Sequence, residues 1–386
     1  MKILAGSESI TIRHYFDWAA TSPCGEAAAP APLGNPSSKH AEGREAKRAL
    51  EDARSRCAAV LKVPPETLYF TSGGTESNCI TLFSCLLRKG RGRVICSHAE
   101  HTSIREGIGT LERMGRATGK IAVDETGRVS ADNITKALEK YGDVRFAAVM
   151  SVKNETGAVT DMVSVRDAIR AYGGPPAHLH CDMVQAAGKI PVDIPLWGTD
   201  SAAISAHKIG GPRGIGLLYL RRPMDVLCKG GGQEGKIRGG TENVQGALAL
   251  ASCLERRVSG IANGEYAAAK TRWKKLTSSL AAMERCVIIP EERVSMDEDA
   301  FSPYILQAAF KGVPGEVMAR ALDDRGFAVS TGSACSSAAP GRPVLAAMGL
   351  DEETRSEGIR VSQGWTTTDE EIDLLLEAIS EALKKL

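Results

Sequence analysis

Short apolar segments alternate with helical patterns along much of this sequence, and the alternation restricts the folds open to it. The apolar segments lie at 93–97, 144–152, 178–182, 200–205 and 216–220, and the helical patterns at 75–89, 133–141 and 163–172. Strands that alternate with helices usually form a parallel sheet, because a parallel pair needs a long crossover connection. The sequence therefore predicts an α/β fold with a mainly parallel sheet.

The pattern changes after Thr241. A long helical region runs to about residue 285 with a break at 260–264, and apolar segments follow at 305–310 and 327–330. The capping box Thr368-Asp369-Glu370-Glu371 opens a final amphipathic helix. We predict two domains: a large cofactor-binding α/β domain of residues 14–259, and a smaller α+β domain of residues 1–13 and 260–386.

Composition excludes several classes of protein. The 386 residues have a net charge of +1, so there is no electrostatic case for nucleic acid or an anionic membrane as partner. No apolar run approaches the roughly 20 residues of a transmembrane helix, and the first residues do not resemble a secretory signal. The ten cysteines are scattered and contain no CxxC pair, which does not indicate a disulfide framework. We therefore expect a cytoplasmic protein.

Lys208 is the most informative single residue. The segment Ser205-Ala206-His207-Lys208 follows a predicted strand, and a turn rich in glycine and proline comes next. A lysine amine can form a Schiff base with an aldehyde cofactor, while the Ser205 hydroxyl and the His207 imidazole can donate hydrogen bonds to a phosphate. The alternative is a surface lysine in a turn. The segment points to an aldehyde cofactor that carries a phosphate.

A second segment suits the phosphate. Thr71-Ser72-Gly73-Gly74-Thr75 follows a short predicted strand and opens a helix. Glycine lets the backbone approach a phosphate closely, and a helix N-terminus offers free N–H groups and a favourable dipole. An ordinary helix cap is the alternative. We predict Gly74 and Thr75 as phosphate-binding residues.

Asp182 ends the apolar segment 178–182, and Gln185 follows it. A carboxylate at a strand end can pair with a protonated pyridine nitrogen, which keeps the ring an electron sink. Gln185 can then hydrogen-bond the ring hydroxyl. A helix N-cap is the other interpretation of Asp182.

Two further polar residues follow predicted strands. His101 can stack on a pyridine face and transfer protons, and Asn154 can bond the ring hydroxyl or a substrate carboxylate; a simple turn is the alternative for Asn154. His98, Glu100 and His101 could also share a metal ion. No third and fourth ligands stand at zinc-like spacing, so we expect no metal.

These motifs, in this order, resemble the class V aminotransferase superfamily of fold type I pyridoxal-phosphate enzymes. The resemblance is strongest to the cysteine desulfurases of the housekeeping or nitrogen-fixation type. It extends almost end to end through further segments at 15–21, 34–38, 230–234, 238–243, 330–337 and 356–362. It implies a homodimer with pyridoxal 5'-phosphate bound to Lys208.

The resemblance also implies an activity. L-cysteine loses its sulfur to Cys335 as a persulfide and leaves as L-alanine, and His101 acts as an acid–base group. Cys335 stands among glycine, alanine and serine residues in a segment typical of an accessible thiol. A surface cysteine without a role is the alternative. The sulfur then passes to a protein acceptor, such as an iron–sulfur scaffold or a tRNA-thiolation protein.

The remaining site residues follow from the same resemblance. Arg360 is implied as the clamp for the substrate carboxylate, assisted by Asn35 and Asn154, because a planar guanidinium suits bidentate recognition. Thr241 is implied to reach the cofactor phosphate of the partner subunit. The sequence departs from the family pattern at 23–34, which is shorter than usual, and at 235–239.

Two other functions stay open. The chain could be a selenocysteine lyase or another β-eliminating enzyme with the same cofactor. It could also be a degenerate module that kept the fold for partner binding and lost catalysis. The motif positions still hold lysine, aspartate, histidine, arginine and cysteine, which argues against the degenerate module.

Overall fold

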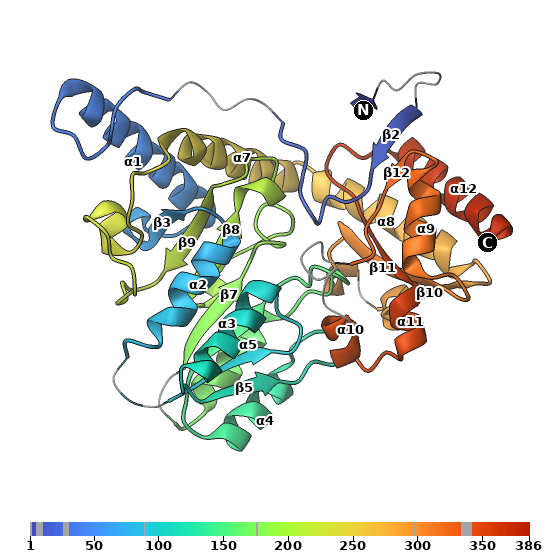
Figure 1. The fold of residues 1–386 in the computed structure, drawn as a ribbon, viewed down its shortest axis with the longest axis horizontal. Helices are drawn as coiled ribbons and strands as arrows, with labels where there is room; N and C mark the ends of the chain where they lie inside the picture. Colours follow the sequence, from blue (N-terminus) through green and yellow to red (C-terminus); the bar gives the residue numbers. More distant parts are fainter. Residues whose placement is uncertain are drawn as a thin grey trace.

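The structure is a computed structural model, and it describes residues 2–4, 11–25, 31–88, 90, 92–174, 177–296, 298–332 and 342–386. The chain forms two lobes (Figure 1). The large lobe contains the segments coloured from blue through green to yellow. The small lobe contains the orange and red segments and also the first strands of the chain.

A seven-stranded sheet is the centre of the large lobe. Its strands, in spatial order, are β3 (Leu68–Thr71), β9 (Gly216–Leu220), β8 (Ser201–Ser205), β7 (His178–Asp182), β6 (Val144–Met150), β4 (Arg93–Ser97) and β5 (Thr118–Ile121). β9 is antiparallel to both neighbours, and the other strand pairs are parallel. The predicted α/β fold with a mainly parallel sheet is confirmed.

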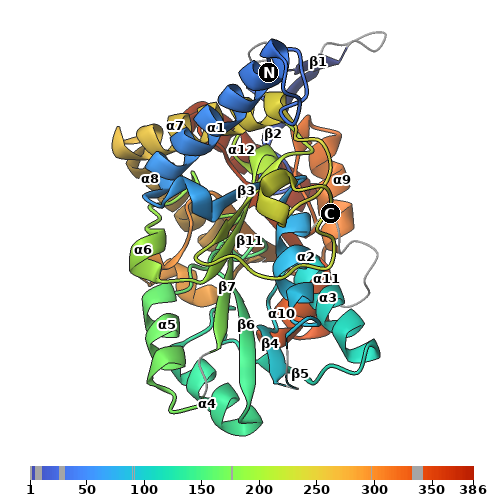
Figure 2. The same cartoon turned by 90° about the vertical axis from the view of Figure 1, so that its left-hand side faces the viewer.

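Helices cover both faces of this sheet, as Figure 2 shows for α4 and α5 on one side and α2 and α3 on the other. The helices are α1 (Ala41–Leu61), α2 (Gly74–Ser84), α3 (Thr102–Arg113), α4 (Ala131–Tyr141), α5 (Met162–Ala171), α6 (Ile194–Trp197) and α7 (Val244–Ala262). The two-sided cover explains why β8 and β9 are buried along their whole length. Among the described residues, no helix combines the length and apolarity needed to cross a membrane.

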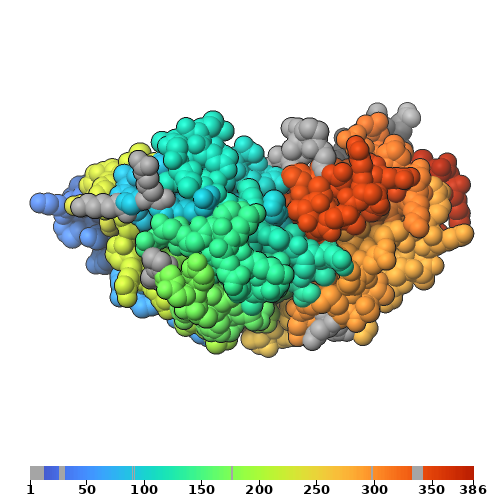
Figure 3. Space-filling view, turned by 90° about the horizontal axis from the view of Figure 1, so that it is seen from below, coloured from blue at the N-terminus to red at the C-terminus, as the bar shows by residue number. Residues whose placement is uncertain are grey.

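The small lobe contains two three-stranded sheets. One consists of β10 (Cys286–Ile289), β11 (Ile305–Phe310) and β13 (Gly358–Ser362), and the other of β1 (Lys2–Leu4), β2 (Thr11–Tyr15) and β12 (Phe327–Ala328). Its helices are α8 (Glu265–Ala281), α9 (Gly315–Asp323), α10 (Pro343–Ala347), α11 (Glu352–Glu357) and α12 (Asp369–Lys385). Figure 3 shows the green segments of the large lobe lying against the orange segments of the small lobe.

Most predicted segments lie where the sequence pattern placed them. The strands at 93–97, 178–182, 216–220 and 305–310 have the predicted bounds. The capping box forms as predicted, since the Thr368 side chain accepts from Glu371 N and the Glu371 side chain accepts from Thr368 N. The helix predicted at 75–89 was too long, because the chain leaves the helix after Ser84 for a turn.

We propose that the boundary between the two domains lies near residue 260. α7 continues through this position to Ala262, and α8 begins at Glu265 after Gly264, whose φ of 97° favours glycine. Figure 1 shows α7 leading from the large lobe toward α8 in the small lobe. β2 pairs with β12, which supports assigning the start of the chain to the small domain.

A buried ion pair fixes the loop at 230–240 to the sheet. The Glu234 carboxylate accepts two hydrogen bonds of 2.8 Å from the Arg54 guanidinium and one of 2.7 Å from Phe70 N. Glu234 has a φ of 44°, which a non-glycine residue rarely adopts. The ion pair with Arg54 and the hydrogen bond from Phe70 N therefore stabilise Glu234 in this rarely adopted backbone conformation.

We predict that Glu234→Ala lowers the free energy of unfolding by about 3–5 kcal/mol, because it leaves the Arg54 charge buried without this partner. The matched control is Glu51→Ala, since Glu51 also pairs with Arg54 but its side chain is 51% exposed. That control should cost less than about 1 kcal/mol. Urea unfolding of both variants measures the difference, and equal losses would contradict the assignment.

Candidate functional site

A polar cavity lies where the two lobes meet, at the carboxyl edge of the parallel sheet. It is lined by Ala19, Ala20, Gly74, Thr75, Asn78, His101, Met150, Asn154, Asp182, Val184, Gln185, Ser205, His207, Lys208 and Arg360. Most lining residues come from the large lobe, whereas Arg360 lies on β13 of the small lobe. The predicted residues Gly74, Thr75, His101, Asn154, Asp182, Gln185, Ser205, His207, Lys208 and Arg360 are thus brought together.

Lys208 follows β8 through a single turn of 3-10 helix over Ala206–Lys208. Its Nζ donates hydrogen bonds to the carbonyl oxygens of Ala19 and Ala20, at 2.6 and 2.7 Å. These bonds hold the amine inside the cavity. Burial and the nearby Lys208 lower the pKa of His207 to about 4, so the imidazole is neutral near pH 7.

The start of α2 lies at one end of the cavity and is suited to bind an anion. The first N–H groups of a helix have no partner within it. A Cβ atom on Gly74 would lie 2.6 Å from Val184 Cγ2, so a larger residue would displace the wall of the cavity. Thr75, Ser205, His207 and Arg213 line the adjoining hollow. This arrangement of N–H groups, hydroxyls, a neutral imidazole and the Arg213 guanidinium suits a phosphate.

Asp182 closes β7 and is buried. Its Oδ1 accepts from Val184 N at 3.0 Å, and its Oδ2 accepts from Asn78 Nδ2 at 2.8 Å. The carboxylate is thereby held in one orientation at the cavity wall. It is suited to accept a hydrogen bond from a protonated ring nitrogen.

His101 is the N-cap of α3, and its Nδ1 accepts a hydrogen bond of 3.1 Å from Ser103 N. A neutral imidazole that accepts at Nδ1 carries its hydrogen on Nε2. Burial lowers the pKa of His101, which favours this neutral form. His101 therefore presents an Nε2–H donor in the cavity.

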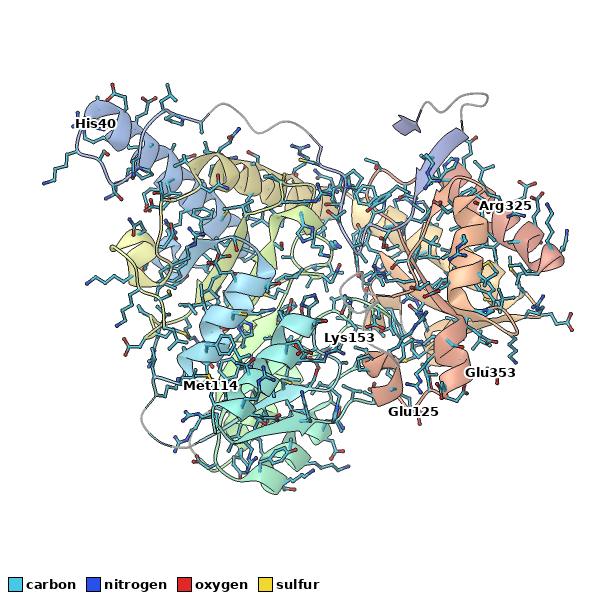
Figure 4. The ribbon with its side chains drawn as sticks, in the orientation of Figure 1. His40, Met114, Glu125, Lys153, Arg325 and Glu353 are labelled. Carbon is cyan, nitrogen blue, oxygen red and sulfur yellow. The ribbon has the colours of Figure 1, made fainter. Side chains whose placement is uncertain are left out.

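The residues of the metal alternative do not converge. His98 is exposed, whereas Glu100 is buried and accepts from Met150 N at 2.7 Å. Glu100 also lies 3.9 Å from the ammonium of Lys153, a buried residue labelled near the junction of the lobes in Figure 4. Within the described ranges, no group of three or more His, Cys, Asp or Glu side chains is arranged to hold a metal ion.

Gln185 is supported by Lys189, which the sequence reasoning missed. Lys189 Nζ donates to Gln185 Oε1 at 2.7 Å, and Gln185 Nε2 donates to Ala19 O at 2.9 Å. Burial holds the pKa of Lys189 well below its usual value. The available signal was the spacing of four residues between two polar side chains in an otherwise apolar segment.

Arg360 is almost fully buried, with 1% of its surface exposed. Its Nη1 donates to Asn154 O at 3.0 Å and its Nη2 to Asp17 Oδ1 at 2.8 Å. Its Nε has no hydrogen-bond partner among the described residues. A buried guanidinium with an unused N–H is suited to bind a carboxylate.

Three predicted residues are not placed in this cavity. Asn35 lies in the exposed turn before α1, where its Oδ1 accepts from Ser37 N at 2.9 Å. The start of that helix, marked by His40 in Figure 4, lies at the outer edge of the large lobe. Thr241 is exposed and does not line the cavity of its own chain. Cys335 lies outside the described residues.

The donor set fits pyridoxal phosphate, part by part. The α2 N-terminus with Thr75, Ser205 and His207 suits the phosphate, and Asp182 suits the ring nitrogen. Gln185 and His101 suit the ring hydroxyl and the ring face, and the Lys208 amine suits the aldehyde. All of them line one cavity or its adjoining hollow.

Comparison with known proteins agrees with this chemistry. The family model "Aminotransferase class-V" matches residues 14–375. An IscS-like cysteine desulfurase of Mycobacterium tuberculosis is 31% identical and aligns over 96% of both chains. A putative cysteine desulfurase IscS 1 of Bacillus subtilis is 32% identical over 97% of this chain and 99% of its own.

The fold comparison gives the same result. A solved NifS-like protein superposes with a TM-score of 0.87 at 30% identity and covers 97% of this chain and 100% of its own. Matches of this extent include both lobes and every segment that lines the cavity. The chain belongs to the pyridoxal-phosphate-dependent class V aminotransferase family, among the cysteine desulfurases of the IscS and NifS kind.

Proposed function

We propose that this enzyme is a cysteine desulfurase that converts L-cysteine to L-alanine and carries the released sulfur on Cys335 as a persulfide. The observation that supports it best is the position of Lys208 Nζ in one cavity with Asp182, His101 and Arg360. An amine, a carboxylate acceptor, an Nε2–H donor and a guanidinium are the groups that this reaction needs around an amino-acid substrate.

Bound pyridoxal phosphate supplies an electron sink for the α-carbon of the substrate. Arg360 binds the substrate carboxylate, and Asn154 beside it helps to orient that group. Lys208 Nζ takes the α-proton and returns it, while His101 Nε2 donates or accepts a proton at the same face. The neutral His207 holds the phosphate end without adding a positive charge beside Lys208.

The sulfur leaves by attack of the Cys335 thiolate. The thiolate sulfur forms a bond to the sulfur of L-cysteine as the carbon–sulfur bond breaks. The electron pair of the broken bond stays with the substrate carbon, which is protonated to give L-alanine. The product on the protein is a persulfide on Cys335, ready for transfer to an acceptor thiol.

The first experiment incubates the purified enzyme with L-cysteine, measures L-alanine, and locates the added sulfur by peptide mass spectrometry. We expect L-alanine together with a persulfide on the Cys335 peptide. Cys335→Ser should keep the cofactor absorbance and lose both persulfide and sulfide release. Cys228→Ser is the matched control, because Cys228 is an exposed thiol outside the cavity. Undiminished sulfide release from Cys335→Ser would refute this role.

The same assay separates the alternatives. A selenocysteine lyase would release L-alanine from L-selenocysteine and little from L-cysteine. A degenerate module would be colourless after reconstitution with pyridoxal phosphate. A yellow protein that forms neither L-alanine nor persulfide would keep the cofactor and assign another amino-acid substrate.

A second prediction concerns Arg360. Arg360→Lys should raise the KM for L-cysteine by roughly 10- to 100-fold, because lysine cannot form the bidentate pair with a carboxylate. The cofactor absorbance should change little. Arg320→Lys, at an exposed position of α9, is the control and should leave KM unchanged. Steady-state kinetics measure both, and an unaltered KM for Arg360→Lys would remove the residue from substrate binding.

The proposal includes a homodimer in which Thr241 of each chain reaches the cofactor phosphate of the other. Support comes from the exposure of Thr241 and from the Arg54–Glu234 pair, which holds the loop before it. The proposal also includes a role for Asn35 at the substrate carboxylate. Asn35 lies in an exposed turn and does not line the cavity of its own chain.

We expect sedimentation velocity to give twice the mass of one chain. Thr241→Val should weaken pyridoxal-phosphate binding roughly tenfold through the loss of one hydrogen bond to a charged group. Thr271→Val, on an exposed part of α8, is the control. A strictly monomeric and fully active enzyme would contradict the dimer.

We also propose a cytoplasmic location and a protein sulfur acceptor. Persulfide chemistry requires thiols that stay reduced, which the cytoplasm provides. An iron–sulfur scaffold or a tRNA-thiolation protein would present such a thiol. Transfer of ³⁵S from the enzyme to candidate acceptors identifies which of them receives the sulfur.

A further inference from the structure

A chain of buried and partly buried polar side chains leads away from the cavity wall, where it ends at Asp182. Its centre is Asn78 on α2, which is 1% exposed. Asn78 Nδ2 donates to Asp182 Oδ2 at 2.8 Å and to Ser103 Oγ at 2.9 Å. Asn78 Oδ1 faces His180 Nε2 at 2.9 Å. One amide therefore contacts three polar groups on two elements, β7 and α3.

The chemistry of these groups fixes the direction of each bond. A carboxylate only accepts, so Asn78 must turn its NH₂ group toward Asp182 and its Oδ1 toward His180. The His180 nitrogen that faces Oδ1 must then carry a hydrogen. Burial lowers the pKa of His180 to about 3, so the ring is neutral and its Nδ1 is an acceptor.

The chain continues in the same direction toward the far end of β7. Two hydroxyls face His180 Nδ1, that of Thr81 at 3.3 Å and that of Ser201 at 2.8 Å. Thr81 Oγ1 donates its hydrogen to Asn78 O at 2.9 Å, so the hydrogen for His180 Nδ1 comes from Ser201. His178 Nε2 lies 2.7 Å from Ser201 Oγ and donates to it. Every donor in the series from His178 to Asp182 thus points toward Asp182.

A branch of the chain reaches His101. Ser103 Oγ accepts from Asn78, so its own hydrogen is free to be donated to His101 Nδ1 at 2.9 Å. This bond, together with the one from Ser103 N, keeps the hydrogen of His101 on Nε2. Asn78 therefore determines the hydrogen-bonding state of two cavity groups, one carboxylate and one imidazole.

We propose that Asn78 is a positioning residue that holds Asp182 as a pure acceptor and His101 as an Nε2–H donor, with His180 and Ser201 fixing its amide. The inference rests on the proposed function. Because each of its oxygens already accepts an N–H bond, the Asp182 carboxylate is held in one orientation, in which it can accept from a protonated ring nitrogen, the form that the electron sink needs.

Side chains that only fill the space between α2 and β7 would not need to be polar. Apolar side chains of similar size can fill such a space at lower desolvation cost than a polar chain. Polar chains of this kind orient and polarise their members. The side chains of His178 and His180 also stack on Phe146, with ring centroids 5.3 and 6.0 Å away, so the imidazoles have little freedom to reorient.

The test reconstitutes the holoenzyme with pyridoxal phosphate labelled with ¹⁵N in the ring and follows the ¹⁵N chemical shift with pH. We expect a protonated ring nitrogen in the wild type near pH 7. Asn78→Leu should shift the protonation equilibrium of that nitrogen by roughly tenfold, about one pH unit, toward the neutral form. His180→Leu should shift it in the same direction by a smaller amount.

The controls separate this role from loss of stability. Gln363→Leu removes another buried amide, which donates to Ala269 O and Pro303 O away from the cavity, and should leave the ¹⁵N shift unchanged. His180→Gln keeps an N–H donor for Asn78 and should restore most of the wild-type value. If Asn78→Leu does not fold, the two His180 variants decide the question.

Unchanged ¹⁵N titrations in Asn78→Leu, or in His180→Leu, with the cofactor bound would overturn the inference. A wild-type protein that binds no pyridoxal phosphate would instead overturn the proposed function. The two failures are therefore distinguishable.

Discussion

The parallel arrangement of β4, β6, β7 and β8 is the constraint on which the site depends. Each crossover helix returns the chain to the same starting edge, so all these strands end at the opposite edge. His101, Asn154, Asp182 and Lys208 stand at or shortly after those ends. Apart from the histidines of β7, the strands are largely apolar and covered on both faces, so the groups that line the cavity gather at one edge, where the small lobe covers them.

This constraint explains why much of the site could be predicted from the sequence. Lys208 and Asp182 follow apolar segments, and both are residue types with few common roles at a strand end. Their positions along the chain therefore indicated both the fold and the chemistry. The resemblance implied a role for Thr241 at the partner subunit, whereas the separation of Asn35 from the cavity could not be foreseen, because its motif indicates a role without indicating its place in the fold.

Other features depend on contacts between distant segments. Asn78 stands within α2, where a local pattern cannot distinguish it from a polar residue on a helix surface. Its role arises because α2 lies over β7 and brings its amide to Asp182. Lys189 and Glu234 are similar cases, since charged residues are usually exposed and their burial depends on tertiary packing. Burial of this kind is costly and is tolerated where the bonded geometry serves the site.

Arg360 connects the two lobes. Its guanidinium, on β13, already donates to Asp17 and to the carbonyl of Asn154. In the proposed role of Arg360, an incoming amino acid competes with the Asp17 carboxylate for the same cation, and recognition is an exchange of one anion for another. The affinity for the amino acid then reports the difference between its carboxylate and that of Asp17. A carboxylate that binds Arg360 only as strongly as Asp17 does adds nothing to this affinity. Selectivity among amino acids then depends on the rest of the molecule, beyond the carboxylate that they all share.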